Sequence, residues 1–334
     1  MRISIVICNY NYGAFLEAAI RSAVEQDYAD TEVLVVDDGS TDDSRSILER
    51  WRNRVSVLYK DNGGQISAYN AGFERITGDV VIFLDSDDLL DRNACSAVVA
   101  AFEPQVAKVH FRLRLIDSAG APLGACIPTR LAEGDLADRL LVHGELYDSS
   151  PGSGNAYRVS ALRRLMPMLA DSRDRHGADF FAILGTSLLG TVRTAHRGPL
   201  GSYRVHRPEQ TQALAFGNAS PDPEEPARAY RRYGRARLWL AERLGADCIL
   251  PAPAPIFSLE KSRYALAIFS ARTYVDGLRA GGKLLSESVL PSIYRMRASV
   301  PFRVAMMGWA VGILVLPRSM GLPVARYVCN PGNR

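Results

Sequence analysis

Short apolar runs alternate with segments of helical periodicity along the first hundred residues. The runs are rich in β-branched residues, and between them apolar residues recur every three or four positions. The pattern predicts strands at 3–7, 33–36, 55–59 and 80–84, and helices at 13–24, 44–51, 65–76 and 92–102. Strands this apolar are expected to be buried on both faces, and helical crossovers between them imply a parallel sheet.

Each of these predicted strands ends in a polar cluster. The clusters are Asn9 with Tyr10, Asp37 with Asp38, Asp61 with Asn62, and the segment 85–88. Because parallel strands point the same way, their carboxyl ends share one rim of the sheet, where ligands of such folds bind. The sequence therefore predicts a ligand site built from all four clusters.

The fourth cluster holds three carboxylates in four residues, Asp85, Asp87 and Asp88. Alternate residues of an extended segment face the same way, so Asp85 and Asp87 can face one ligand. Carboxylates this close stay ionised most easily with a cation between them. Oxygen ligands suit Mg²⁺ or Mn²⁺ shared with substrate phosphates. The competing interpretation is an acidic helix cap, with Asp88 or Asp91 as the capping residue.

The second cluster, Asp37-Asp38-Gly39-Ser40, has two interpretations as well. A carboxylate at a strand end can accept hydrogen bonds from a nucleobase or a ribose. Asp-Gly-Ser is also ordinary turn chemistry. The neighbouring clusters favour the ligand-binding interpretation.

Together these segments resemble the nucleotide-binding half of family 2 glycosyltransferases. The similarity runs in order through residues 5–11, 35–42, 62–72 and 78–88, and covers roughly residues 3–92. It implies a GT-A fold, which is a Rossmann-like, mostly parallel sheet flanked by helices. It also implies inverting transfer from a nucleotide-sugar, most often a UDP-sugar.

The resemblance assigns roles along the rim. Cys8 and Tyr10 are expected near the base, Asp37 on the base, Asp85 at the ribose and Asp87 on the metal. The full set expected to bind the nucleotide-sugar is Cys8, Tyr10, Asp37, Asp38, Gly64, Asn70, Asp85 and Ser86.

A weaker similarity continues to about residue 212. Ser153, Gly154 and Asn155 lie in a loop expected near the acceptor. Asp179 stands where the family has the Asp of a Glu-Asp pair, the catalytic base, but Ala178 replaces the Glu, so Asp171 and Asp174 compete for the role. His206 is expected to reach the metal or the diphosphate.

Two further departures bear on the mechanism. Tyr69 stands where an Arg is common in the family, so a cation near the phosphates is missing, and Arg75, Arg204 or Arg207 could replace it. The Gln-x-x-Arg-Trp signature of processive members is absent from the chain. This favours transfer of a single sugar.

Beyond residue 104 the pattern loosens. It predicts a strand at 109–116 and helices at 160–169, 180–189, 227–244, 258–280, 284–296 and 304–316. The expected organisation is a glycosyltransferase domain at 1–217, with a nucleotide half (1–104) and an acceptor half (105–217), followed by a helical extension at 218–334. Residues 217–226, rich in Pro and acids, are the expected linker or lid.

The first 225 residues and the rest of the chain differ in net charge. Residues 1–225 hold 23 basic and 31 acidic residues, a balance of −8, whereas residues 226–334 hold 17 and 5, a balance of +12. The longest uncharged run, 304–317, is shorter than the roughly 20 residues of a spanning helix. A basic extension with such a run is expected to contact an anionic membrane peripherally, although solvated Arg faces would give the same charge balance.

Five well-separated cysteines without a Cys-x-x-Cys pair argue against a disulfide framework or a zinc site. The N-terminal apolar run is too short for a signal peptide. A cytoplasmic protein is therefore expected, peripheral on the inner face of the plasma membrane. Nucleic-acid binding is not expected, because aromatic and basic residues do not interleave in the basic region.

The expected activity is metal-dependent transfer of one sugar to a hydroxyl of a glycan or a lipid-linked acceptor in cell-surface polysaccharide synthesis. The alternative is a non-catalytic nucleotide-sugar-binding protein, which Ala178 permits. A nucleotidyltransferase would carry a Gly-rich loop with Arg or Lys after the first strand, and residues 9–13 hold no cation.

Overall fold

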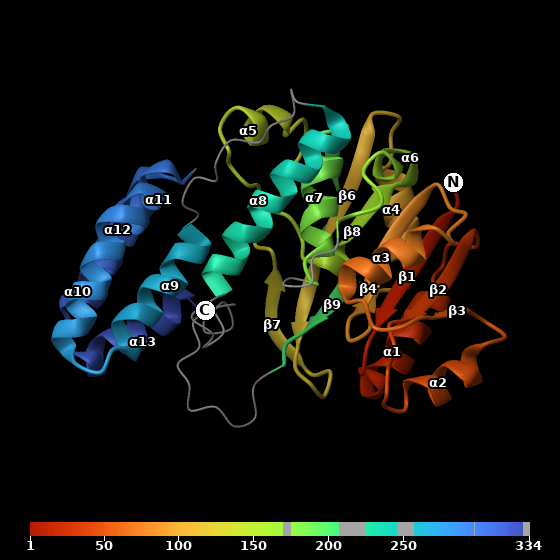
Figure 1. The fold of residues 1–334 in the computed structure, drawn as a ribbon, viewed down its shortest axis with the longest axis horizontal. Coiled ribbons are helices and arrows are strands. Elements are labelled where there is room, and N and C mark those ends of the chain that lie inside the picture. Colours follow the sequence, from red (N-terminus) through yellow and green to blue (C-terminus); the bar gives the residue numbers. More distant parts are fainter. Residues whose placement is uncertain (170–174, 207–224, 246–256, 297, 330–334) are drawn as a thin grey trace. The chain divides into compact units, whose positions relative to one another are not determined.

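The computed structural model describes residues 1–169, 175–206, 225–245, 257–296 and 298–329. The chain divides into two compact units (Figure 1). The first unit comprises residues 1–143, 147–207 and 235–251, and the second comprises 144–146, 208–234 and 252–334. The predicted domain boundary at residue 217 lies outside the described residues.

The described part of the first unit forms a nine-stranded mixed sheet (Figure 1). Its strand order is β3-β2-β1-β4-β8-β6-β9-β5, and β7 pairs with β6. The strands are β1 (Ile3–Asn9), β2 (Thr31–Asp37), β3 (Ser56–Tyr59), β4 (Val80–Asp85), β5 (Leu89–Leu90), β6 (Val106–Ile116), β7 (Pro122–Ile127), β8 (Asn155–Arg158) and β9 (Thr191–Arg204). The helices around this sheet are α1 (Gly13–Val24), α2 (Ser44–Trp51), α3 (Gln65–Phe73), α4 (Ala94–Ala101), α5 (Ala137–Leu141), α6 (Val159–Arg163) and α7 (Ala178–Thr186).

The N-terminal half of the sheet is parallel, as predicted. Strand β1 lies between β2 and β4, and β2 pairs with β3. Ile5, Val35 and Ile82 are fully buried in the core, because helices cover both faces of the central strands. The expectation of burial on both faces is wrong for β3, which is an edge strand with Tyr59 38% exposed.

The second half of the sheet adds antiparallel pairs. Strand β8 runs antiparallel to both β4 and β6, whereas β9 runs parallel to β6. The predicted strand at 109–116 begins three residues earlier, at Val106. The predicted helix at 160–169 ends at Arg163, before Pro167, and the helix predicted at 180–189 is α7. An α/β fold with a helical C-terminal region is thereby confirmed.

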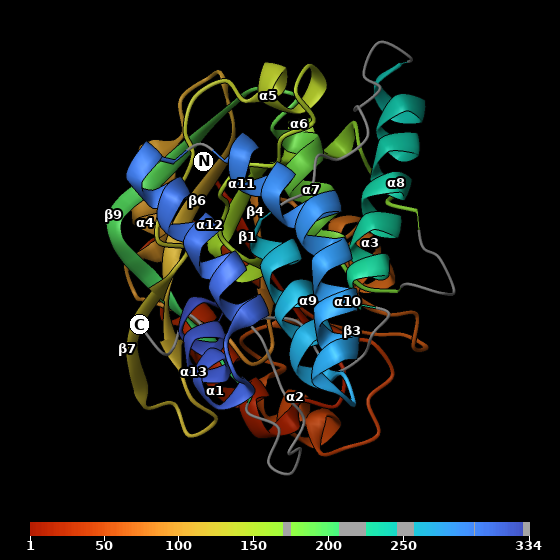
Figure 2. The ribbon, with the colours of Figure 1, turned by 90° about the vertical axis from the view of Figure 1, so that its left-hand side faces the viewer.

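The second unit is helical. Its helices are α9 (Phe257–Ser270), α10 (Tyr274–Leu284), α11 (Leu290–Arg295), α12 (Val300–Val315) and α13 (Arg318–Cys329) (Figure 2). They pack around a core that includes Tyr264, Trp309 and Ile313. A π-helical turn, Leu285–Val289, joins α10 to α11. Helix α8 (Glu225–Leu244) contributes to both units. No helix of the described ranges has the length and apolarity to cross a bilayer.

The single helix predicted at 258–280 is two helices. The chain breaks after Ser270, and Thr273 caps α10 by accepting a 3.1 Å hydrogen bond from the Asp276 amide. This is the ordinary N-cap interaction of a threonine. The pattern of apolar positions continues across the break, so periodicity alone did not reveal it.

Candidate active site

The four strand-end clusters meet at one rim, as predicted. Asn9 is the register partner of Asp37, and Cys8 is the partner of both Val36 and Asp85. A cavity of about 470 Å³ opens there. Its lining includes seven of the predicted residues, Cys8, Tyr10, Asp38, Gly64, Asp85, Ser86 and Asp87.

Asp37 lies beneath this lining, 4% exposed. Its Oδ1 accepts hydrogen bonds from Asn9 Nδ2 (2.9 Å) and Ser40 Oγ (2.5 Å), and its Oδ2 accepts one from the Ser40 amide (3.3 Å). Asn9 itself lines the cavity, and its buried Oδ1 has no hydrogen-bond partner among the described residues. Asp37 therefore orients Asn9 toward the cavity, and its predicted direct contact with a base stays a prediction.

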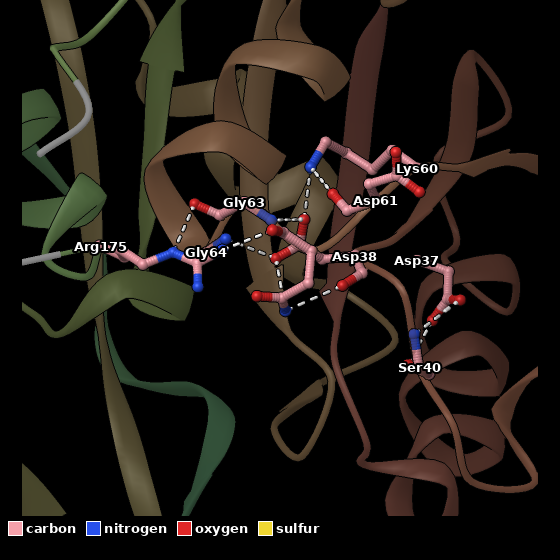
Figure 3. A network of polar contacts seen from close by, with 9 residues as sticks. Asp37, Asp38, Ser40, Lys60, Asp61, Gly63, Gly64 and Arg175 are labelled. Carbon is pink, nitrogen blue, oxygen red and sulfur yellow. Dashed lines mark hydrogen bonds and ion pairs between the residues drawn. The ribbon is translucent and has the colours of Figure 1, made fainter. Parts of the chain in front are cut away.

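Asp38 fixes the loop that forms one wall of the cavity (Figure 3). Its carboxylate accepts hydrogen bonds from Lys60 Nζ at 2.5 Å, from the Gly63 amide at 2.9 Å and from the Gly64 amide at 2.6 Å. Asn62 Nδ2 adds a fourth donor at 3.2 Å. Lys60 balances the charge of this carboxylate, and the carboxylate holds the loop in place.

Gly64 has a positive φ of 83°, which favours glycine. A Cβ at this position would lie 2.5 Å from the Cβ of Arg175, so the loop and Arg175 approach closely. Arg175 donates from Nε to the Gly63 carbonyl (3.1 Å) and from Nη2 to the Asn62 carbonyl (2.5 Å). Figure 3 shows it meeting the loop from the side opposite Lys60.

Arg175 lines the cavity and is not among the site residues predicted from the sequence. Of the cations expected to replace the missing Arg at position 69, Arg204 is buried and bonded to the carbonyls of Asp87, Asp117 and Ser118. Arg75 is exposed and Arg207 lies outside the described residues. Among the arginines that the structure describes, Arg175 is the one that lines the cavity.

In the fourth cluster, few groups among the described residues balance the negative charge of the carboxylates. Burial, followed by the charges of Asp87 and Asp179, raises the pKa of Asp85 to about 7. Asp88 is 1% exposed and accepts hydrogen bonds from Ser153 Oγ (2.6 Å) and the Arg204 amide (2.9 Å). Burial and the neighbouring carboxylates nevertheless raise the Asp88 pKa well above its usual value.

Asp87 lines the cavity, and its Oδ2 lies 2.7 Å from His206 Nε2. The structure thus brings together the two residues predicted to bind the metal. Within the described ranges, no group of three or more His, Cys, Asp or Glu side chains has the geometry of a closed metal site. A carboxylate and an imidazole next to crowded carboxylates fit a site whose other ligands are substrate phosphates and water.

Asp179 stands in the first turn of α7, across Gly152 from Asp85. A Cβ at Gly152 would lie 3.4 Å from Asp85 Oδ2, 3.5 Å from Asp179 Cβ and 3.5 Å from the Tyr69 hydroxyl. The predicted base therefore lies beside the acidic cluster. Its competitors Asp171 and Asp174 lie outside the described residues.

Gln65, which is also not among the predicted site residues, links the two sides of this site. Its Oε1 accepts hydrogen bonds from the amides of Gly177 (2.8 Å) and Ala178 (3.2 Å), at the start of α7. Its side chain also hydrogen-bonds Asp85, which offsets part of the rise that burial and the neighbouring carboxylates cause in the pKa of that carboxyl. Gln65 thereby holds the helix of Asp179 at a set position relative to Asp85.

The predicted acceptor loop is buried. Ser153 Oγ donates to Asp88 and accepts from the Asp85 amide (3.1 Å), and Asn155 Nδ2 donates to the Pro151 carbonyl (2.8 Å). A Cβ at Gly154 would lie 1.9 Å from Ser150 Oγ, so this position requires glycine. These contacts position the loop, and binding of an acceptor by these residues stays a prediction.

Asn70 was expected to bind the nucleotide-sugar. Its amide donates to the Met168 carbonyl and accepts from the Met168 amide, both at 2.9 Å. It lies outside the cavity lining. The structure gives it the role of joining α3 to the segment before α7.

Fold and site thus define an α/β protein with an acidic rim beside its cavity. The model of glycosyl transferase family 2 matches residues 4–127. An uncharacterised glycosyltransferase of Nostoc sp. is 33% identical over 234 residues, which cover 68% of this chain and 72% of that protein. The chain belongs to glycosyltransferase family 2.

Other relatives match shorter segments. The poly(ribitol-phosphate) β-N-acetylglucosaminyltransferase TarS of Staphylococcus aureus is 30% identical over 129 residues, 36% of this chain and 22% of that protein. A putative teichuronic acid biosynthesis glycosyltransferase of Bacillus subtilis, TuaG, is 37% identical over 90 residues, 26% of this chain and 36% of that protein. The structure of S. aureus TarS 1–349 with UDP-GlcNAc has a TM-score of 0.53 at 15% identity over 98% of this chain and 90% of that chain, which confirms the GT-A fold.

Proposed function

We propose that this glycosyltransferase moves one sugar, with inversion, from a nucleotide-sugar to an acceptor hydroxyl. The observation that carries the proposal is the convergence of the rim clusters on one cavity, with Asp179 across Gly152 from Asp85. In a direct displacement the acceptor hydroxyl attacks the anomeric carbon of the donor while a base takes the hydroxyl proton, so the base must lie beside the donor site, as Asp179 does. TarS binds UDP-GlcNAc in its structure, which supports a UDP-sugar.

The nucleoside would occupy the side of the cavity formed by Cys8, Asn9 and Tyr10. The unpartnered Asn9 Oδ1 offers a hydrogen-bond acceptor to a base N–H or a ribose hydroxyl. Burial and the charges of Asp85 and Asp38 raise the Cys8 pKa well above its usual value, so its thiol remains neutral. Asp38 and Lys60 keep this wall in place before the ligand arrives.

The diphosphate would lie between Arg175 and Asp87, which line the same cavity. The Arg175 guanidinium supplies positive charge for the leaving group. Asp87 and His206 would hold Mn²⁺ or Mg²⁺, which as a Lewis acid stabilises the negative charge that develops on the departing diphosphate. The carboxylate crowding at Asp85, Asp87 and Asp88 is the feature of this chain that favours a cation there.

Asp179 would remove the proton of the acceptor hydroxyl as the new glycosidic bond forms. A carboxylate within hydrogen-bond reach of the nucleophile contributes roughly 10²–10⁴-fold to the rate. Gln65 fixes the helix that carries Asp179, and Ser153 fixes the loop of Gly152 that separates it from Asp85. No covalent enzyme intermediate is needed for a single inverting displacement.

A glycan or a lipid-linked glycan is the proposed acceptor class, in synthesis of cell-surface polysaccharide. TarS and TuaG, which share this family, are named for polymers of the cell surface. A cytoplasmic location is proposed with it, because the described cysteines are free thiols: Cys8, Cys95, Cys126 and Cys329.

The test is a screen of UDP-, GDP- and dTDP-sugars with Mn²⁺, with release of the nucleoside diphosphate as the readout. We expect one sugar donor to be turned over, and EDTA to suppress the reaction. Nuclear magnetic resonance of the product reports whether the anomeric configuration inverts. Binding of a nucleotide-sugar without any turnover, with glycans and lipid-linked acceptors supplied, would instead establish the non-catalytic alternative.

A further inference from the structure

Apart from Arg303 near its start, helix α12 is apolar on all sides, yet one of its sides is uncovered. The side with Trp309, Ala310 and Ile313 is buried in the core of the second unit. On the other side, Val300, Val304, Val311 and Val315 follow one another at helical spacing. A helix without a polar face is ordinarily buried all round, so this side lacks a partner.

Helix α13 packs against α12 and likewise has one buried and one exposed apolar side. Its buried side holds Gly321, Ala325 and Val328, and its exposed side holds Met320, Val324 and Tyr327. The exposed fractions of these three residues and the four valines of α12 range from 42% to 62%. We call these seven side chains the α12–α13 face.

The helices that form this face and those that pack against them are basic. Residues 257–329 contain ten basic and three acidic residues, a balance of +7. Among the described residues, Arg279, Lys283, Arg295 and Arg326 are exposed cations of these helices. Arg303 and Arg318 bond backbone carbonyls of neighbouring elements, so their charges are fixed close to the ends of α12.

Two kinds of partner could cover such a face, a lipid surface or another protein. Charge complementarity favours the lipid surface, because exposed apolar side chains on a set of basic helices match acyl chains beneath anionic headgroups. The length of α12 sets the geometry. Sixteen residues span about 24 Å, whereas a hydrocarbon core is about 30 Å thick, so α12 can lie in the interface and cannot cross it.

We propose that the α12–α13 face docks the protein on an anionic membrane surface. The valines and Tyr327 insert among the headgroups, and the exposed cations of these helices neutralise lipid phosphates. The proposal deepens the proposed function, because docking would bring the transferase to a lipid-linked acceptor. It can be tested without any sugar transfer, so its failure leaves the proposed reaction standing.

The test is flotation of the full chain with vesicles, without nucleotide-sugar. We expect the protein to float at low salt with an equal mixture of phosphatidylglycerol and phosphatidylcholine, to float poorly with phosphatidylcholine alone, and to be released by high salt. The double variant Val304→Glu/Val311→Glu should lower the bound fraction at least about tenfold. Its far-ultraviolet circular dichroism should match the wild type, because both side chains are exposed.

The matched control is Val142→Glu/Leu238→Glu, which makes the same chemical change at two exposed residues of the first unit. This control should float like the wild type. Equal flotation of the two double variants would overturn the proposal, as would equal binding of the wild type to neutral vesicles. A wild type that fails to float and forms a dimer that Val304→Glu/Val311→Glu dissolves would show that a second copy covers the face.

Discussion

Two acidic clusters at the same rim of the sheet look alike in sequence and differ in physical state. In the first, Asp37 and Asp38 are surrounded by donors of the protein itself, among them Asn9, Lys60 and the Gly63 and Gly64 amides. In the second, no Lys or Arg of the described residues forms a salt bridge with Asp85, Asp87 or Asp88, and Asp87 pairs with His206. Burial and the charges of Asp87 and Asp179 raise the pKa of Asp85 to about 7. The first cluster builds the cavity wall. The second lacks balancing positive charge from the protein, which a bound metal cation would supply.

The largest effect expected is on catalysis, beside the second cluster. Asp179→Asn removes a proton acceptor with little change in shape, so we expect kcat to fall by roughly 10²–10⁴-fold. The affinity for UDP should stay near the wild-type value, because Asp179 faces the acceptor in this account. Steady-state kinetics and calorimetry measure the two quantities.

Asp30→Asn is the control for that variant, since Asp30 is exposed and remote from the rim. It should leave kcat unchanged. An Asp179→Asn enzyme with wild-type kcat would remove Asp179 from the mechanism and return attention to Asp171 and Asp174.

Replacing an Asp by Asn should change the free energy of unfolding differently in the two clusters. Asp38→Asn leaves Lys60 and a set of backbone amides without their carboxylate, so we expect the free energy of unfolding to fall by about 2–4 kcal/mol. Asp85→Asn removes a charge that burial and its neighbours oppose, so in metal-free buffer its unfolding free energy should be no lower than that of the wild type. Urea titrations of both variants check this, and equal losses would erase the distinction between the clusters.

A smaller effect is expected at the residue that bridges the site. Gln65→Leu removes the hydrogen bonds to Asp85 and to the start of α7, and we expect kcat to fall about tenfold with a smaller change in KM. Gln105→Leu, at an exposed glutamine bonded to Glu103, is the matched control. If Gln65→Leu raised KM and left kcat unchanged, Gln65 would bind the sugar donor and would not position the base.

The smallest effect is expected at Arg175. Arg175→Gln should weaken UDP binding about fivefold, because one partly solvated cation near a diphosphate contributes about 1 kcal/mol. The same change at the exposed Arg75 should have no effect on UDP binding. A reversed result would restore the expectation that Arg75 replaces the missing arginine.

Much of the first unit was predictable because its signals are local. Residues 3–7 and 80–84 are continuous apolar strands, and each polar cluster follows its strand directly. Because the predicted strands are parallel, the clusters at their carboxyl ends could be placed on one rim of the sheet. The edge position of β3 was not predictable, because burial of a strand depends on what lies on its far side.

The site residues that were not predicted contact partners that lie far away along the chain. Gln65 meets Gly177, and Arg175 meets Gly63, each more than a hundred residues away along the chain. Strand β9 was missed because Thr191–Arg204 mixes Gly, Pro and Arg and gains its pairing from β6. Helix α13 was missed because Pro323 interrupts its pattern.

The most direct test of the difference between the clusters is calorimetric titration of the protein with UDP in Mn²⁺ and in EDTA. For the wild type we expect Mn²⁺ to tighten UDP binding at least about tenfold. In Asp87→Ala the Mn²⁺ effect should vanish, while the weak binding in EDTA is retained. Binding of UDP that is equally tight with and without Mn²⁺, or an Mn²⁺ effect that survives in Asp87→Ala, would contradict the claim that the second cluster is completed by a cation and a diphosphate.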